Sequence, residues 1–373
     1  MKDRLNYAAT CLFGLEGLVG EEIDSLGYER TETIDGRVYF SGGIDAIARC
    51  NMWLRCAERL YIVVGKFRCE TFTELFDGVK AIPLENYISI KDAFPVKGWS
   101  LNSQLHSIPD CQSIIKKACV ERLKSVYKTN WFEETGPIHQ IQFSIMKDQV
   151  TVMLDTTGHG LHKRGYRATA NAAPIKETLA AAMCDLARIY PDTKIYDPFC
   201  GSGTILIEAA LMAKKQAPGL RQHFAAERFS FIPESVWREQ RSAAMDRILP
   251  NIEFEAHGYD IDPECVKLTL ENAKKAGVER YVTAEVRDIS DFRLPEGRTL
   301  VITNPPYGER LLDIKAAEKL YGVMGKVFVR ELGKKYYVIS PHDEFEKFFG
   351  TKADKKRKLY NGMIKCDLNM YFK

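Results

Sequence analysis

The stretch TKIYDPFCGSGTILIEAALMAKK, residues 193–215, decides the fold of this 373-residue chain. A strand-like run leads into a glycine-containing turn, and a helix-like apolar run follows it. Strand-like and helix-like segments then alternate, which predicts an α/β fold with a parallel sheet and helices on both of its faces. These segments cover residues 252–260, 263–277, 282–289, 299–306, 317–332 and 334–340. An insertion rich in arginine and aromatic residues occupies 218–250, and residues 357–373 are typical of an antiparallel pair that turns at Asn361-Gly362.

The turn DPFCGSGT, residues 197–204, is a candidate ligand site because open α/β sheets bind ligands beyond the carboxyl ends of their strands. Gly201 and Gly203 allow the backbone to approach a ligand closely. Asp197 is unfavourable for a pyrophosphate but suits an ammonium or a hydroxyl group. The full dinucleotide fingerprint fails because Leu206 occupies the position of its third glycine. The alternative is an ordinary tight turn.

The next two strands also end in acidic residues. After the strand at 252–260, Asp260 can hold a ribose diol and Ile261 can lie against an adenine. Asp262 precedes a proline and equally suits a helix cap, and capping alone is the alternative for both aspartates. After the strand at 282–289, Asp288 can accept from an adenine amino group while Ile289 packs on the ring. Three carboxylates at one sheet edge predict an adenosine with a positively charged tail, which S-adenosylmethionine has.

The fourth strand ends in TNPPYGER, residues 303–310, where two prolines stop the strand rigidly. The Asn304 side-chain oxygen and the Pro305 carbonyl are uncharged acceptors suited to the exocyclic amino group of a base. Pro306 stiffens this corner, and Tyr307 can stack on a base that has left its helix or loop. We call Asn304, Pro305, Pro306 and Tyr307 the amino-group clamp. The alternative is a turn with a packing tyrosine.

The first 160 residues are typical of an α+β region with several strands and amphipathic helices. Strands are expected at 7–14, 37–42 and 59–67, a hairpin at 138–158, and helices at 15–28, 44–53, 71–82 and 110–127. The last helix carries Lys116 and Lys117 on its solvent side, where they can contact phosphate or form a plain wet surface.

The composition is that of a soluble globular protein, with 45% hydrophobic and 28% charged residues and a formal net charge of +3. No apolar run is long enough to cross a membrane, and no signal peptide is evident. Ten single cysteines without a CxxC pair favour reduced thiols in a cytoplasm and argue against a metal site. The weak positive charge permits a nucleic-acid partner, and the oligomeric state is not readable.

These motifs resemble the Class I S-adenosylmethionine-dependent methyltransferases of the amino-group type, whose signature is [NDS]-P-P-[YFW]. TNPPYGERL, LHKRGYR and DPFCGSGT followed by LIEAA are similar to the THUMP-domain RNA methyltransferases, and most similar to the bacterial family that makes N2-methylguanosine in 23S rRNA. The resemblance implies a ferredoxin-like segment at 1–55, a THUMP RNA-binding domain at 56–160 and a Rossmann-like methyltransferase domain with a mostly parallel, seven-stranded sheet at 161–373. The longest family members carry a second methyltransferase domain, whereas this chain shows one, so a second activity is not expected.

The resemblance and the motifs together predict the site residues. The cofactor contacts are expected at Asp197, Pro198, Phe199, Cys200, Gly201, Gly203, Thr204, Asp260, Ile261, Asp288, Ile289 and Asn304, with the amino-group clamp as the catalytic group and no metal. The junction HKRGYR, residues 162–167, predicts RNA contacts through Lys163, Arg164, Tyr166 and Arg167, or alternatively a solvated basic hinge within 160–173.

The leading hypothesis is an RNA guanine-N2 methyltransferase that acts on 23S rRNA or on an assembling large subunit. An N6-adenine methyltransferase acting on RNA or DNA is the nearest rival, because the clamp suits both amino groups, and a tRNA guanine-N2 methyltransferase is a further alternative. An RNA-binding factor without turnover has no need of Asp197, Asn304 and Tyr307 together. A nicotinamide oxidoreductase is disfavoured by Leu206 and by the clamp.

Overall fold

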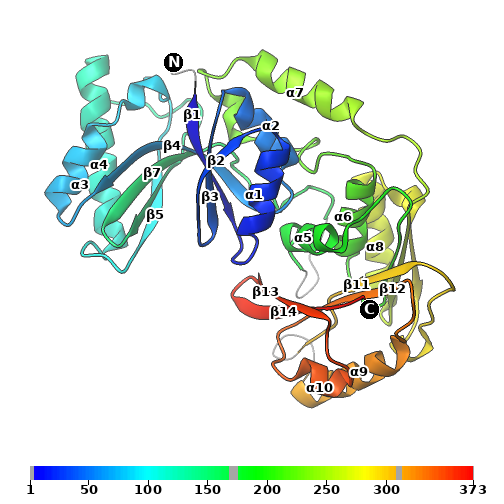
Figure 1. The fold of residues 1–373 in the computed structure, drawn as a ribbon. Coiled ribbons are helices and arrows are strands. Elements are labelled where there is room, and N and C mark those ends of the chain that lie inside the picture. Colours follow the sequence, from blue (N-terminus) through cyan, green and yellow to red (C-terminus); the bar gives the residue numbers. More distant parts are fainter. Residues whose placement is uncertain (1–3, 168–174, 308–312, 373) are drawn as a thin grey trace.

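The computed structural model of the protein describes residues 4–167, 175–307 and 313–372, which form two seven-stranded sheets (Figure 1). The first sheet is built from the N-terminal residues and the second from the C-terminal residues, in agreement with the α+β and Rossmann-like regions expected from the sequence. Among the described residues, no helix is both long and apolar enough to span a membrane.

The first sheet has the strand order β2-β3-β1-β4-β7-β6-β5. Only β5 and β6 pair in parallel, and the other neighbours are antiparallel. The twelve-residue strand β4 pairs with β1 on one side and with β7 on the other, so it belongs to both N-terminal segments. The strands are β1 (Leu5–Cys11), β2 (Glu29–Ile34), β3 (Arg37–Gly42), β4 (Ala57–Arg68), β5 (Val96–Leu101), β6 (Ile141–Met146) and β7 (Gln149–Asp155).

The helices of this half bury the apolar side chains of one sheet face in the main core. They are α1 (Glu16–Ser25), α2 (Asp45–Trp53), α3 (Phe72–Lys80) and α4 (Ile108–Tyr127). The other face carries a small separate cluster around Tyr39, Tyr61 and Met153. On that face Arg37 of β3 donates to Ser144 Oγ of β6 over 3.2 Å although three strands lie between them. The sheet is therefore strongly curled.

The second sheet has the order β10-β9-β8-β11-β12-β14-β13, in which the first five strands are parallel. β14 runs antiparallel to both β12 and β13, and the β13–β14 turn consists of Gly362 and Met363, one residue beyond the Asn361-Gly362 turn expected from the sequence. The strands are β8 (Lys194–Asp197), β9 (Glu255–Asp260), β10 (Val282–Val286), β11 (Thr299–Thr303), β12 (Lys334–Ser340), β13 (Lys355–Asn361) and β14 (Ile364–Tyr371). The accompanying helices are α5 (Glu177–Ala187), α6 (Thr204–Ala213), α8 (Pro263–Ala276), α9 (Ile314–Val327) and α10 (Phe345–Phe349).

The insertion at 218–250 fastens the two halves together. It contains α7 (Glu234–Asp246), which extends along the outside of the molecule (Figure 1). The backbone N–H groups of Ala225 and Ala226 donate to Thr157 and Thr156 at the end of the first sheet. The Phe229 ring stacks on the buried His139 with centroids 3.9 Å apart. These backbone hydrogen bonds and this ring stacking fix the N-terminal half against the insertion.

Two strands and three helices of the described residues were not expected from the sequence, namely β2, β5, α5, α7 and α10. β2 is exposed along its whole length, so it lacks the alternation of buried and exposed residues that marks a half-buried strand, and no strand was predicted over β5. No helix was predicted over α5, which begins a few residues after the expected hinge within 160–173. The part of the expected hinge at 168–173, and Gly308 to Arg310 of the clamp motif, lie outside the described residues.

Candidate active site

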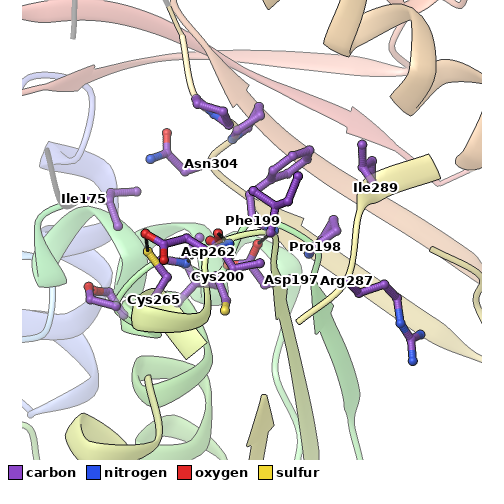
Figure 2. A pocket seen from close by; sticks show the side chains of 18 of the residues that line it. Ile175, Asp197, Pro198, Phe199, Cys200, Asp262, Cys265, Arg287, Ile289 and Asn304 are labelled. Atoms are coloured by element: carbon purple, nitrogen blue, oxygen red, sulfur yellow. Dashed lines mark hydrogen bonds between the residues drawn. The ribbon is translucent and has the colours of Figure 1, made fainter. Parts of the chain in front are cut away.

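The carboxyl ends of β8, β9 and β11 open into one cavity of about 610 Å³. β8 lies between β9 and β11, so the chain reverses its direction of travel across the sheet at β8, where α/β sheets commonly bind ligands. Figure 2 shows Asp197, Asp262, Cys265 and Asn304 around this space. The lining residues are Ile175, Asp197, Pro198, Phe199, Cys200, Gly201, Ser202, Thr204, Ile205, Asp260, Ile261, Asp262, Glu264, Cys265, Arg287, Asp288, Ile289, Asn304, Pro305, Pro306, Tyr307 and Leu320.

Asp197, the last residue of β8, is buried in the floor of the cavity. Its Oδ1 accepts from Thr303 Oγ1 at 2.6 Å and from the Phe199 N–H at 3.1 Å. Burial raises the pKa of Asp197 to about 7, although both hydrogen bonds oppose the rise. Among the described residues no donor reaches Oδ2, so this carboxylate can accept a cationic partner.

The glycines of the turn at 197–204 have different roles. Gly201 has a φ of +53° and lines the cavity, and a Cβ there would meet nothing within 4 Å. Gly203 does not line the cavity, in contrast to the cofactor contact expected from the sequence. It begins α6 with a φ of +76°, and a Cβ on it would lie 2.7 Å from Thr269 of α8. Gly203 is therefore required for packing two helices closely.

Asp260 ties the second strand to the glycine turn. Its Oδ2 accepts from the Gly201 N–H at 3.0 Å and its Oδ1 from the Asp262 N–H at 3.0 Å. Asp262 is the N-cap of α8 and accepts from the Glu264 N–H at 2.9 Å, which is the capping role expected for it. Ile261 remains 70% exposed beside the cavity, as an apolar surface available to a planar ring.

The third strand contributes Asp288 and Ile289 to the cavity wall. Asp288 is exposed and accepts from the Ser290 N–H at 2.8 Å, and hydrogen bonds from the side chain and then the N–H of Ser290 lower the pKa of its carboxyl. Ile289 is buried in the second apolar cluster and presents only its edge to the cavity. Asp288 therefore combines a local capping bond with a position from which it can accept from a ligand.

The amino-group clamp begins where β11 ends. Asn304 Oδ1 is buried, and no donor reaches it among the described residues. A buried acceptor without a hydrogen bond costs free energy, roughly 1–3 kcal/mol, so this atom is prepared for a donor that comes with a ligand. Pro305 is buried beside it, and both prolines line the cavity.

Tyr307 closes the clamp and is held from another part of the sheet. Asn361, at the tip of the β13–β14 hairpin, donates from Nδ2 to Tyr307 Oη at 2.7 Å. The ring lines the cavity, while its hydroxyl group is engaged with the hairpin. The stacking face of the tyrosine is therefore fixed from the hydroxyl end.

The lining fits S-adenosylmethionine. The acidic side chains Asp197, Asp260 and Asp288 suit the hydroxyl, amino and cationic groups of an adenosine with a charged tail, and they would repel a phosphate. The exposed Ile261 suits the adenine face, and Asn304 Oδ1 offers an unsatisfied acceptor on the opposite side. Among the described residues no group of three His, Cys, Asp or Glu side chains could hold a metal ion.

Two of the RNA contacts expected in the junction 162–167 are wrong, because Arg164 and Tyr166 are buried. Arg164 donates to the backbone carbonyls of Leu161 and Arg55, both at 2.6 Å, and its Nε lies 3.5 Å from Glu208 Oε1. Tyr166 Oη donates to the same Glu208 oxygen at 3.0 Å. The buried carboxylate of α6, which neighbouring sequence does not reveal, draws both side chains inward.

The other expected RNA contacts are distributed differently. Arg167 is half-buried and donates to Thr204 Oγ1 and to the Ile175 carbonyl, both at 2.9 Å, so it supports the first turn of α6. Lys163 and Lys117 are exposed. Lys116 is bound to the Phe94 carbonyl at 3.2 Å and to Glu134. Of the lysines and arginines expected to contact RNA, Lys163 and Lys117 are exposed and form no ion pair within the described residues.

Several residues of the site were missed from the sequence. Thr303, the last residue of β11 and the neighbour of the clamp, supports Asp197, and its position at a strand end could have indicated it. Ile175, Cys265 and Leu320 line the cavity from α5, α8 and α9 or their approaches, and no local signal marks them. Asn361 reaches Tyr307 across 54 positions of sequence, which only the tertiary structure reveals.

Comparison with protein families matches three successive regions of the chain. The RlmL ferredoxin-like domain matches residues 6–61, the THUMP domain residues 69–155, and the RMKL-like methyltransferase domain residues 164–370. The last match alone covers more than half of the chain.

Individual relatives extend over nearly the whole chain. “Putative RNA methyltransferase YpsC” of Bacillus subtilis (strain 168) is 42% identical over 98% of this chain and 95% of its own length. “Ribosomal RNA large subunit methyltransferase K/L” of Cellvibrio japonicus (strain Ueda107) is 33% identical over 98% of this chain. The chain spans only 51% of the length of that relative.

Two crystal structures have nearly the same fold over both chains. SMU.472, described as a putative methyltransferase complexed with SAH, has a TM-score of 0.95 at 42% identity and covers 100% of this chain and 99% of its own. A protein from Listeria monocytogenes str. 4b F2365, described as a predicted N6-adenine-specific DNA methylase, has a TM-score of 0.93 at 44% identity and covers 99% and 96%. S-adenosylmethionine is therefore the cofactor of this fold and cavity. The chain belongs to the family of S-adenosylmethionine-dependent RNA methyltransferases in which an RMKL-like methyltransferase domain follows a ferredoxin-like and THUMP region.

Proposed function

We propose that this protein transfers a methyl group to the exocyclic N2 of a guanine in RNA, and that its substrate is 23S rRNA, either free or in an assembling large subunit. The observation that carries the proposal is the buried Asn304 Oδ1, which lacks a donor among the described residues and lines a cavity suited to S-adenosylmethionine. The K/L relatives are named as methyltransferases of large-subunit ribosomal RNA, which supports the choice of substrate.

The clamp residues bind and orient the amino group. When bound, S-adenosylmethionine supplies an electrophilic methyl group. Asn304 Oδ1 and the Pro305 carbonyl each accept a hydrogen bond from one of the two N–H groups of the exocyclic amino group. These hydrogen bonds turn the nitrogen lone pair towards the methyl group. Because both acceptors are held by a rigid proline pair, little reorganisation is needed at the moment of transfer. The nitrogen becomes acidic once it is methylated, so the site needs no strong base.

Tyr307 supplies the stacking surface for the base. Its ring lines the cavity next to the two prolines, and its hydroxyl group is fixed by Asn361. A base that stacks there must leave its helix or loop, since the cavity lies at the end of the strands. This requirement favours an unpaired or weakly paired nucleotide.

The nearest rival is methylation of adenine N6 in RNA or DNA. The clamp accepts from either amino group, and the Listeria protein carries a name of that kind. Methylation of guanine N2 in tRNA is a second rival. The THUMP region favours RNA over DNA, and the names of the ribosomal RNA relatives favour rRNA over tRNA. The choice of guanine rests on the resemblance of the chain to the bacterial family that makes N2-methylguanosine.

The decisive experiment supplies methyl-labelled cofactor with rRNA, tRNA or plasmid DNA and then digests each product to nucleosides. Label in N2-methylguanosine from rRNA is the expected result. Label confined to N6-methyladenosine, or found only in tRNA or DNA, would contradict the proposal. The clamp variant Asn304→Ala serves as the control for contaminating activity.

A further inference from the structure

The amino-group clamp is not held by β11 alone. Asn361 Nδ2, on the β13–β14 hairpin, lies 2.7 Å from Tyr307 Oη and donates to it. The Asn361 side chain is buried, with 6% of the residue exposed, and the Cys366 thiol of the facing strand also interacts with the Tyr307 side chain. The phenol group is therefore enclosed by the hairpin, while the ring remains in the cavity wall.

The hairpin presents Asn361 from a rigid turn. Asn361 pairs with Ile364 in the antiparallel ladder, and Gly362 in the turn has a φ of +67°, a conformation that favours glycine. Leu359 and Cys366, which face each other in the same ladder, are fully buried. The turn and the buried side chains of Leu359 and Cys366 fix the direction of the Asn361 amide before any RNA is bound.

The N-terminal half holds this hairpin from the other side. Arg357 of β13 donates to the Gly14 carbonyl at 3.0 Å, and the Tyr360 ring meets the Phe13 ring edge-on with centroids 5.8 Å apart. Gly14 has a φ of +90°, and a Cβ on it would lie 2.6 Å from the Lys358 carbonyl. The loop between β1 and α1 thus lies directly against the edge strand that carries Asn361 (Figure 1).

We propose that Asn361 is a positioning residue that orients the Tyr307 ring for stacking on the target base, from a hairpin that the N-terminal half holds in place. The inference rests on the proposed function, in which Tyr307 stacks on a nucleobase. It extends that function by assigning a role to a strand pair far from the cofactor turn. Asn361 does not touch the base and acts through the tyrosine hydroxyl group.

The test is a double-mutant cycle. Asn361→Leu keeps the size of the side chain and removes the donor, and Tyr307→Phe keeps the ring and removes the acceptor. Each variant should lower kcat for methyl transfer to RNA about tenfold, on the scale of losing one buried hydrogen bond. The affinity for S-adenosylhomocysteine should stay within about threefold, and the double variant should lose no more than either single one.

A matched control is Asn369→Ala in the same hairpin. Asn369 is also buried, but it faces Lys356, five positions along β13 from Asn361. It should lower thermal stability without changing kcat. The positioning role would be overturned if the losses of kcat in Asn361→Leu and Tyr307→Phe multiplied in the double variant. An unchanged kcat in Asn361→Leu would overturn it as well.

The cycle is read as total methyl transfer to RNA, whichever nucleoside receives the label. If the product were N6-methyladenosine, the proposed guanine specificity would fail while the coupling between Asn361 and Tyr307 would still be measured. If the product were N2-methylguanosine and the coupling were absent, only the positioning role would fail.

Discussion

Two buried polar groups, the side-chain oxygen of Asn304 and the carboxyl of Asp197, face the cavity from neighbouring strands. The burial of each costs free energy that a hydrogen-bonding or cationic ligand can recover. Asn304 Oδ1 has no donor among the described residues, and Asp197 keeps an unusually high pKa in the cavity floor. Thr303, which donates to Asp197, directly precedes Asn304 in the chain. The cofactor side and the base side of the site are therefore one residue apart on β11.

Asn304→Ala tests the clamp. The change removes the acceptor for the base while leaving the carboxylates of the cofactor side intact. We expect kcat to fall about 100-fold or more, on the scale of losing a preorganised polar group in an active site. The affinity for S-adenosylhomocysteine, measured by calorimetry, should stay within about threefold. A kcat close to that of the unaltered protein would remove the clamp from the mechanism.

Asp197 predicts the pH dependence of cofactor binding. Burial raises its pKa from the ordinary 3.8 to about 7, so the free protein gains stability from this group at low pH and loses it as the pH rises through about 7. A cationic ligand favours the ionised form. The affinity for S-adenosylmethionine, which carries a sulfonium and an ammonium group, should therefore increase as the pH rises towards about 7 and level off above it, with release of a proton on binding.

Calorimetric titrations in buffers of different ionisation enthalpy measure that proton directly. Asp197→Asn should bind more weakly and show no such release. A pH slope that persists in Asp197→Asn would assign the titration to another group.

At the scale of elements, three side chains of the junction 162–167 contact α6, namely Arg164, Tyr166 and Arg167, whereas Lys163 is exposed. Arg167 donates hydrogen bonds to the hydroxyl group of Thr204, the first residue of α6, and to the carbonyl of Ile175, which precedes α5. Thr204 and Ile175 both line the cavity. A basic side chain that looked like a phosphate contact therefore stabilises the helix start that follows the cofactor turn.

Paired substitutions distinguish the two roles. Arg167→Ala should weaken S-adenosylhomocysteine binding about tenfold, because two hydrogen bonds at the cavity wall are lost. Its RNA affinity without cofactor should remain within about twofold. Lys163→Ala, at an exposed neighbour, should show the opposite pattern, with weaker RNA binding that depends on salt and unchanged cofactor affinity. Weaker RNA binding in Arg167→Ala, with unchanged cofactor affinity, would restore Arg167 as an RNA contact.

Much of the catalytic half could be predicted because its signals are local. Buried parallel strands are apolar throughout, so their ends can be located in the sequence. The polar residues directly at those ends, Asp197, Asp260 and Asn304, could therefore be predicted as site residues. The misassigned residues depend on distant partners. Arg164 and Tyr166 were placed on the surface because their partner, Glu208, lies more than 40 positions away, on α6.

At the scale of the whole molecule, a buried charge network joins the two halves. Glu208 of α6 is fully buried and accepts from Tyr166, while Arg164 lies against it and donates to the Arg55 carbonyl. Arg55 in turn donates to the Gln216 carbonyl at 2.6 Å. Each charged group in this network depends on the others for compensation in the interior.

Glu208→Gln should therefore destabilise the protein by about 3–5 kcal/mol, since it leaves the guanidinium of Arg164 buried without its carboxylate. Urea unfolding measures the change. The exposed Glu239→Gln on α7 is the matched control and should shift the free energy of unfolding by less than about 0.5 kcal/mol. A loss of similar size in both variants would show that the buried network contributes nothing specific.

The strand β4 has a consequence for descent. It pairs with β1 on one side and with β7 on the other, so the ferredoxin-like segment and the THUMP domain share it. A recombination event that separated them would leave one long strand edge unpaired, and such edges promote aggregation. The ferredoxin-like segment and the THUMP domain are thus inherited together, and recombination between genes can exchange both of them but not one alone.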